Sequence, residues 1–346
     1  MRAEPVFRLF ACCVPVRGAR RSTLCDLQRQ QYRLIPNALY EILTEHEGKG
    51  PAELAGLYGP GSRPVLDEYF TFLVENEFGF WTDEPDAFPP LDLSWERPER
   101  ISNAVIDVDA ESRHDYASLV RQLDGLGCVA LQYRFFARVP PDAVRAALEP
   151  TRRSRLRSVE LVLRHDPAWD DDALERLCLQ HQRISQLLVH GAPGERTTRV
   201  RALATPIVFT TQRIDSGDHC GYVHPKLFAL TLEAFTEARA FNSCLNRKLS
   251  VDARGEVRNC PAMARSFGPA ATTPLARVAA DPVFREPWSV TKDQVETCRD
   301  CEFRYVCTDC RAFVADPANP LSKPARCGYD PYTAAWSDAP PAGVGA

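Results

Sequence analysis

The chain has 346 residues, 45% of them hydrophobic and 25% charged, which is the composition of a globular protein with room for about two or three domains. A formal net charge of -4 gives no electrostatic basis for binding nucleic acid, and no run approaches the ~20 apolar residues of a membrane span. The N-terminal apolar run is interrupted by Arg8, Pro15 and Arg17 and makes a poor secretory signal. We therefore expect a cytoplasmic protein without a nucleic-acid or membrane partner.

Residues 1–88 are predicted to form a winged-helix-like unit of short strands and helices. The pattern predicts strands at 6–10, 14–17 and 22–27, a helix at 37–46, an amphipathic helix with apolar residues from 66 to 74, and an aromatic strand at 78–81. Such a unit can capture an extended peptide at a strand edge. A packing domain without a ligand fits the same pattern.

A proline-rich linker at 89–100 is predicted to precede a domain at 101–215 in which strands and helices alternate. Strand-like runs lie at 104–108, 129–136, 159–163, 184–189 and 206–210, and helical runs at 116–123, 143–148 and 173–181. This alternation predicts βαβ units and a parallel sheet, hence an α/β fold. About five strands are visible, fewer than the eight of a complete barrel, so we expect a reduced or partial βα barrel or an open sheet.

The region 216–335 is rich in cysteine. Seven of its thiols have an ordered spacing: Cys244, Cys260, Cys298, Cys301, Cys307, Cys310 and Cys327. Because disulfides are rare in a reducing compartment, metal ligation is the default explanation for clustered cysteines. The two C-x2-C pairs are separated by five residues. The pairs of zinc sites usually lie about a dozen or more residues apart, so this spacing favours iron–sulfur centres, with zinc as the alternative.

A tight turn is expected at 252–256, where the sequence DARGE lies between Val251 and Val257. The turn would bring Cys244 and Cys260 toward each other from the two arms of a hairpin. Together with the four thiols of 298–310, this hairpin implies two centres. A loop-rich region of this kind has little core of its own, so a metal centre would contribute to its folding free energy.

The ordered cysteine pattern resembles the SPASM domain, which carries two auxiliary [4Fe–4S] clusters in radical SAM peptide-modifying enzymes. Three stretches carry this resemblance further: NSCLNRKLSVDARGEVRNCPAM at 242–263, CRDCEFRYVCTDCRAF at 298–313 and KPARCGYDPYT at 323–333. Together with YFTFLVENEFGFWTDEPDAFPPLDL at 69–93, they are similar to the SPASM-domain peptide maturases of grasp-with-SPASM systems. The resemblance implies a ribosomally made precursor peptide and an ATP-grasp ligase as partners.

The resemblance also implies a ligand set for each of the two clusters. It assigns Cys298, Cys301, Cys307 and Cys327 to one cluster, and Cys244, Cys260 and Cys310 to the other. The family usually has three residues before its fourth cysteine, whereas this chain has two before Cys310. Cys220 is our candidate for the missing eighth ligand. His219, an iron left open for substrate, and a free Cys220 thiol are the alternatives.

The C-x3-C-x2-C triplet of a radical SAM enzyme is absent from the sequence, so we expect no S-adenosylmethionine. The remaining thiols are expected to be small core residues: Cys12, Cys13, Cys25, Cys128 and Cys178. Cys12 and Cys13 are predicted to point to opposite faces of a strand and not to share a site. Asp107 and Asp109 are predicted to be caps or solvated charges.

No catalytic residue can be named, because the sequence has no nucleophile elbow, phosphate-binding loop or zinc-protease helix. Two hypotheses follow. The chain is a precursor-binding adaptor for the ligase, or it is a peptide-modifying enzyme whose clusters act as redox or Lewis-acid centres. The last segment, 336–346, is expected to be a disordered tail.

Overall fold

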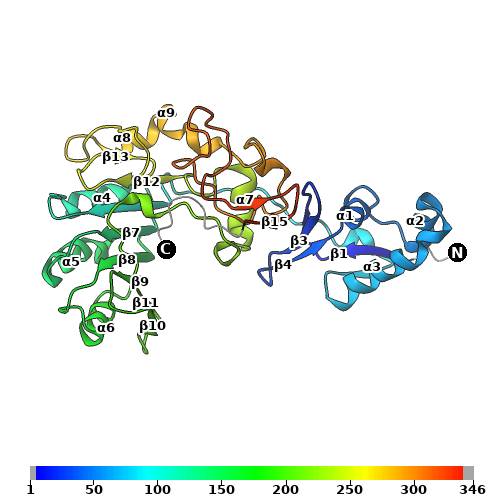
Figure 1. Ribbon diagram of the computed structural model, residues 1–346, viewed down its shortest axis with the longest axis horizontal. Coiled ribbons are helices and arrows are strands. Elements are labelled where there is room, and N and C mark those ends of the chain that lie inside the picture. The colour runs from blue at the N-terminus through cyan, green and yellow to red at the C-terminus, as the bar shows by residue number, and fades with distance from the viewer. Residues whose placement is uncertain (1–4, 338–346) are drawn as a thin grey trace. The chain divides into compact units, whose positions relative to one another are not determined.

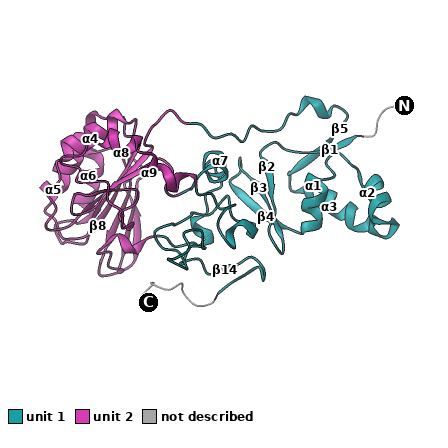
Figure 2. Cartoon of the chain, turned by 90° about the horizontal axis from the view of Figure 1, so that it is seen from above, with its two compact units in different colours: residues 1–96, 221–243, 290–346 teal, residues 97–220, 244–289 magenta. Residues whose placement is uncertain are grey.

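The computed structural model describes residues 5–337 of the chain, which divides into two compact units (Figures 1 and 2). Unit 1 comprises residues 1–96, 221–243 and 290–346, and unit 2 comprises 97–220 and 244–289. The cysteine-rich region expected at 216–335 therefore contributes to both units. Of the expected tail, residues 338–346 lie outside the described residues. Within residues 5–337, no helix is long and apolar enough to cross a membrane.

Unit 2 is built on a mostly parallel sheet of eight strands in the order β10-β11-β9-β8-β7-β6-β12-β13. The strands are β6 (Asn103–Val108), β7 (Ala130–Phe135), β8 (Ser158–Arg164), β9 (Ile184–His190), β10 (Arg196–Arg199), β11 (Pro206–Thr210), β12 (Lys248–Val251) and β13 (Val257–Arg258). Only the two edge pairs, β10–β11 and β12–β13, are antiparallel. The predicted α/β class and the parallel sheet are confirmed.

Helices alternate with the parallel strands of unit 2. They are α4 (Tyr116–Gly125), α5 (Pro141–Leu148) and α6 (Asp171–Gln180), followed later in the chain by α8 (Leu275–Ala280) and α9 (Pro282–Arg285). The Asp115 carboxylate begins α4 by accepting the N–H of Ser118 at 2.9 Å, and Asp170 begins α6 by accepting that of Ala173 at 2.7 Å. The apolar faces of these helices join the strands in one hydrophobic core.

In its described residues, unit 1 combines small sheets with four α-helices. Its strands are β1 (Val6–Leu9), β2 (Cys13–Val16), β3 (Ser22–Asp26), β4 (Gln31–Ile35), β5 (Gly79–Thr82), β14 (Tyr329–Asp330) and β15 (Ala335–Trp336), and its helices are α1 (Asn37–Thr44), α2 (Pro51–Tyr58), α3 (Arg63–Glu75) and α7 (Leu232–Ala240). β2, β3 and β4 form an antiparallel sheet, whereas β1 pairs with β5 and β14 with β15.

Strand β3 is buried on both faces and joins the N-terminal part of unit 1 to its cysteine-rich part. Successive side chains of a strand point to opposite faces, so Leu24 packs with α1 and α3 while Cys25 packs with Phe303 and Tyr329. The Thr23 hydroxyl donates to the carbonyl oxygen of Glu302 at 2.8 Å. Residues 5–96 and the segment around 302 are therefore parts of one packed body.

Strand β4 was not predicted from the sequence. It follows a turn in which Gln30 adopts a φ of 55° and the Asp26 carboxylate accepts the backbone N–H groups of Gln28 and Arg29. A positive φ is usually marked by glycine or asparagine, and this turn has neither. The absence of that signal explains the missed strand.

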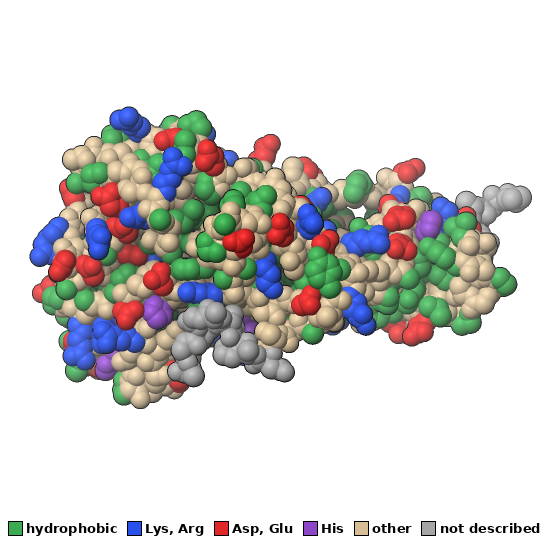
Figure 3. Space-filling view, turned by 45° about the horizontal axis from the view of Figure 1, so that its top comes forward, with side chains coloured by type: hydrophobic (Ala, Val, Ile, Leu, Met, Phe, Trp, Pro, Cys, Tyr) green, Lys and Arg blue, Asp and Glu red, His purple; other side chains and the backbone are tan. Residues whose placement is uncertain are grey.

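The visible face of the molecule carries Lys and Arg side chains interspersed with Asp and Glu, without a large patch of one sign (Figure 3). This mixture agrees with the small formal net charge of -4. It gives no support to a nucleic-acid-binding surface on this face.

Gly18 tests the contact between the N-terminal sheet and the cysteine-rich segment of unit 1. A Cβ atom at Gly18 would lie 2.5 Å from the carbonyl oxygen of Arg21 and 2.8 Å from the backbone nitrogen of Glu302. We expect Gly18→Ala to lower the free energy of unfolding by about 1–3 kcal/mol through overpacking. Chemical denaturation would measure the change.

The matched control is Gly61→Ala, because a Cβ atom at Gly61 would meet nothing within 4 Å. Its free energy of unfolding should stay within about 0.5 kcal/mol of that of the parent chain. Equal destabilisation by the two substitutions would contradict the packing described for Gly18.

Candidate metal centres

Four of the predicted ligand thiols surround one cavity inside unit 1. Cys298, Cys301, Cys307 and Cys327 line one small pocket together with aromatic side chains that include Phe303. All four belong to a single unit, so their grouping is a property of its fold. The structure therefore brings together the four residues that the sequence resemblance assigned to one centre.

Tight backbone turns place three of these thiols close together in sequence and space. A 3-10 turn over Cys298–Asp300 directs the N–H of Cys301 to the carbonyl oxygen of Cys298 at 3.0 Å. The N–H of Phe303 then donates to the sulfur of Cys301 at 3.4 Å, and the N–H of Cys307 donates to the carbonyl oxygen of Phe303 at 3.1 Å. Cys327 belongs to a segment farther along the chain, and an isolated parallel β-bridge pairs its backbone with that of Val223.

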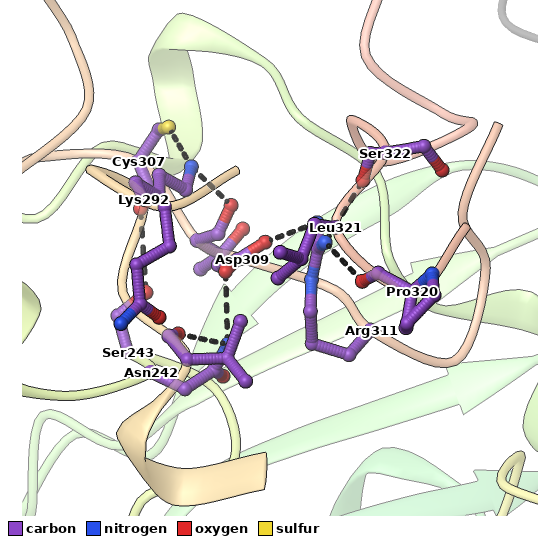
Figure 4. A network of polar contacts seen from close by, with 12 residues as sticks. Asn242, Ser243, Lys292, Cys307, Asp309, Arg311, Pro320, Leu321 and Ser322 are labelled. Atoms are coloured by element: carbon purple, nitrogen blue, oxygen red, sulfur yellow. Dashed lines mark hydrogen bonds and ion pairs between the residues drawn. The ribbon is translucent and has the colours of Figure 1, made fainter. Parts of the chain in front are cut away.

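A buried lysine contacts this group of thiols (Figure 4). Lys292 is only 3% exposed, and its ammonium group donates to the sulfur of Cys307 and to the carbonyl oxygen of Thr308, the latter at 2.8 Å. Lys292 precedes Cys298 by six residues and belongs to no motif. Sequence analysis missed it because nothing in a lone lysine signals burial.

The protonation of these groups depends on burial and on one another's charge. Burial raises the pKa of Cys298 to about 12, and the nearby Lys292 charge only partly opposes this effect. Burial by itself would lower the pKa of Lys292, but the negative charges of Cys307 and Asp309 outweigh it and raise that pKa. An ammonium ion at position 292 and a negatively charged sulfur site therefore stabilise each other.

Asp309 anchors a second set of buried polar contacts beside Lys292 (Figure 4). Its carboxylate forms an ion pair with Arg311 at 2.6 Å and accepts the side-chain amide of Asn242 at 2.9 Å. Arg311 also donates to the carbonyl oxygen of Ser322 at 2.8 Å. These contacts fix the backbone that follows Cys307.

A second group of thiols lies in unit 2. Cys260 forms a hydrogen bond with Cys220, which is the main cause of a pKa of about 6 for Cys260, and the charges of Lys248 and Arg134 lower this pKa further against the effect of burial. The ammonium group of Lys248 lies 3.5 Å from the sulfur of Cys244. Cys220, our candidate for the eighth ligand, therefore lies beside Cys260.

The predicted hairpin that carries two of these thiols is present. β12 and β13 are antiparallel, and the turn between them has Gly255 at a φ of 87°. The Asp252 carboxylate accepts the backbone N–H groups of Arg254 and Glu256 at 3.0 and 2.9 Å. Cys244 and Cys260 flank the two arms of this hairpin.

Cys310, which the resemblance assigns to the same centre as Cys244 and Cys260, belongs to unit 1. It is buried there, and a Cβ atom at Gly221 would lie 2.8 Å from its sulfur. Gly221 has a φ of 87°, so both its conformation and the neighbouring Cys310 exclude a larger residue.

The prediction that Cys12 and Cys13 point apart and share no site was wrong, although Cys13 is buried in the hydrophobic core and Cys12 packs against it. Their sulfurs and a carboxylate oxygen of Asp26 all lie within 4.8 Å of one another. Cys12 lies in a turn and only Cys13 begins β2, so the alternation of a regular strand does not apply to this pair. The other expected core thiols, Cys25 and Cys128 among them, are fully buried.

Asp107 also differs from its prediction. It is 2% exposed and forms a bidentate ion pair with Arg134, with N–O distances of 2.6 and 2.8 Å. Burial raises its pKa, and Arg134 opposes that effect. Asp109 behaves as predicted for a cap, because its carboxylate accepts the N–H groups of Glu111 and Ser112.

Comparison with known proteins adds no relative, because no protein-family model matches this chain and none of the curated proteins is detectably similar to it.

The Asp107–Arg134 ion pair lies beside the second thiol group, since Arg134 also interacts with Cys220 and Cys260. Asp107→Asn leaves a buried guanidinium without its carboxylate, and we expect it to lower the free energy of unfolding by about 3 kcal/mol. Thermal or chemical denaturation measures this change.

The exposed ion pair between Arg63 and Asp67 is the control. Asp67→Asn should change the free energy of unfolding by less than about 0.5 kcal/mol, because solvent screens an exposed pair. A loss of stability at Asp107 as small as that at Asp67 would contradict the role given to the buried pair.

Proposed function

We propose that this protein binds iron–sulfur clusters through its two thiol groups. The observation that carries the proposal is the set of four thiols around one cavity, with the buried Lys292 ammonium bonded to one of them. A buried cation is costly without a negative partner, and four thiolates holding an iron–sulfur cluster supply one. The chemistry of the donor set therefore fits a [4Fe–4S] cluster.

The spacing of the thiols supports a cluster over a single zinc ion. Four sulfurs around one tetrahedral zinc lie about 3.8 Å apart, given Zn–S bonds of about 2.3 Å. Within residues 5–337, the metal-ligand atoms of Cys12, Cys13 and Asp26 all lie within 4.8 Å of one another. The sulfurs of the four cavity thiols do not form a group as tight as this. Four irons with one cysteine each require this wider arrangement.

The second cluster would be held by Cys220, Cys244 and Cys260 in unit 2. A lysine accompanies these thiols too, because Lys248 lies against Cys244. The resemblance adds Cys310 as a further ligand. Two clusters in the same chain also favour the reducing cytoplasm as its location.

The N-terminal part of unit 1 supports a role in binding a peptide. β4 pairs only with β3 among the described strands, so its other edge can accept an extended segment as an added strand. Leu34 on β4 is 44% exposed and offers an apolar contact beside that edge. This arrangement fits the winged-helix-like peptide-recognition unit expected for 1–88.

We infer that the chain takes part in maturation of a ribosomally made precursor peptide beside an ATP-grasp ligase, as a precursor-binding adaptor. The sequence lacks the radical SAM triplet, and the α/β domain is then a reduced barrel-like remnant without that chemistry. The alternative is a peptide-modifying enzyme. In that case the clusters would supply electron transfer or a Lewis-acidic iron.

Metal analysis tests the two centres. Anaerobically reconstituted protein should contain roughly eight irons and eight sulfides per chain, as two [4Fe–4S] clusters require. The double variant Cys298→Ser/Cys301→Ser should lose about half of both. Iron and acid-labile sulfide assays give the numbers.

The control is Cys178→Ser, which removes a fully buried thiol that lies in the core of unit 2 and in neither thiol group. It should keep the full content of iron and sulfide. Zinc without sulfide in the parent protein would refute the cluster proposal.

Peptide binding tests the adaptor role. Leu34→Asp should raise the dissociation constant for the fluorescein-labelled precursor peptide by about tenfold, since burial of one leucine contributes about 1.5–3 kcal/mol. Leu57→Asp, at another exposed leucine on α2, should leave the constant unchanged. Fluorescence anisotropy measures both.

Mass spectrometry of the precursor separates the adaptor from the enzyme. With the adaptor, a mass change requires the ligase, and Leu34→Asp slows it. A mass change that needs this chain but not the ligase would contradict the adaptor role.

A further inference from the structure

The charged group of Lys292 has a thiol sulfur, and no carboxylate, among its hydrogen-bond partners. Its ammonium group donates to the sulfur of Cys307 and to the neutral carbonyl oxygen of Thr308. The sulfur is thus the group in direct contact that can carry an opposite charge. Because the side chain is 3% exposed, water screens this interaction very little.

The neighbouring carboxylate is engaged elsewhere. Asp309 pairs with Arg311 at 2.6 Å and accepts the amide of Asn242 at 2.9 Å. Figure 4 shows these contacts on the carboxylate, while the Lys292 ammonium group points to the sulfur of Cys307. Within the network of Lys292, Asp309 and Arg311, the one carboxylate pairs with Arg311, which leaves the Lys292 charge facing the sulfur of Cys307.

We propose that Lys292 sets the reduction potential of the cluster held by Cys298, Cys301, Cys307 and Cys327, by placing a fixed positive charge on the sulfur of Cys307. Reduction adds one electron and hence one negative charge to the site. A cation at hydrogen-bond distance from a ligand sulfur stabilises the reduced form and raises the potential. This inference rests on the proposed function, since it requires the cluster.

The second thiol group provides an internal reference in the same molecule. Lys248 lies 3.5 Å from the sulfur of Cys244 in unit 2, so each group has a lysine of its own. A substitution at Lys292 should therefore shift one redox transition and leave the other where it is. A general loosening of the fold would disturb both.

The experiment is a redox titration of the reconstituted full-length chain, followed by electron paramagnetic resonance, with dithionite as reductant and soluble mediators. Lys292→Met removes the charge at nearly constant volume and should shift one midpoint to a more negative potential. Asp309→Asn removes a negative charge from the same network and should shift the same midpoint in the opposite direction. Lys226→Met removes the charge of an exposed lysine and should shift neither.

The opposite signs protect the test from a structural artefact. If Lys292→Met fails to assemble its cluster, Lys292→Gln, which also removes the charge, is titrated in its place. An unchanged midpoint in a fully loaded Lys292→Met protein, or shifts of the same sign in both variants, would overturn it. Absence of iron and sulfide in the parent chain would instead refute the proposed function itself.

Discussion

The burial of the Lys292 ammonium against the sulfur of Cys307 is the interaction on which the cysteine-rich part of unit 1 depends. An ammonium ion in a protein interior requires a charged partner, or it loses its proton. Here the surrounding negative groups raise its pKa despite burial. A metal cluster bound by thiolates would place a compensating negative charge beside this ammonium group.

The surroundings of the site hold this interaction in place. Asp309, Arg311 and Asn242 tie the segment after Cys307 to residues that are distant in the chain. On the other side, the Thr23 hydroxyl of β3 reaches the carbonyl oxygen of Glu302, between two of the ligand thiols. The peptide-binding part proposed for unit 1 and the thiol cavity thus share one packed body.

The second thiol group occupies a special position in the connectivity of the chain. Cys220 is the last residue of the first segment of unit 2, and Cys244 is the first residue of its second segment. Residues 221–243, which lie between them in the chain, belong to unit 1. A metal centre that binds both Cys220 and Cys244 would close the loop formed by residues 221–243. Closing a loop of this length reduces the entropy of the unfolded chain, which is the usual way in which a metal clip stabilises a fold.

The sequence by itself determined the elements whose signals are local. The alternation of strands and helices from 104 to 210, the hairpin at Gly255 and the cysteine spacing depend on periodicity, turn residues and ligand spacing, which a linear pattern carries. β4 was missed because its turn has Gln30 where a glycine is usual. Only the tertiary structure decided which residues meet across long separations. Lys292 at Cys307, Asp107 at Arg134, and Cys12 with Cys13 and Asp26 depend on burial and on side-chain direction in three dimensions.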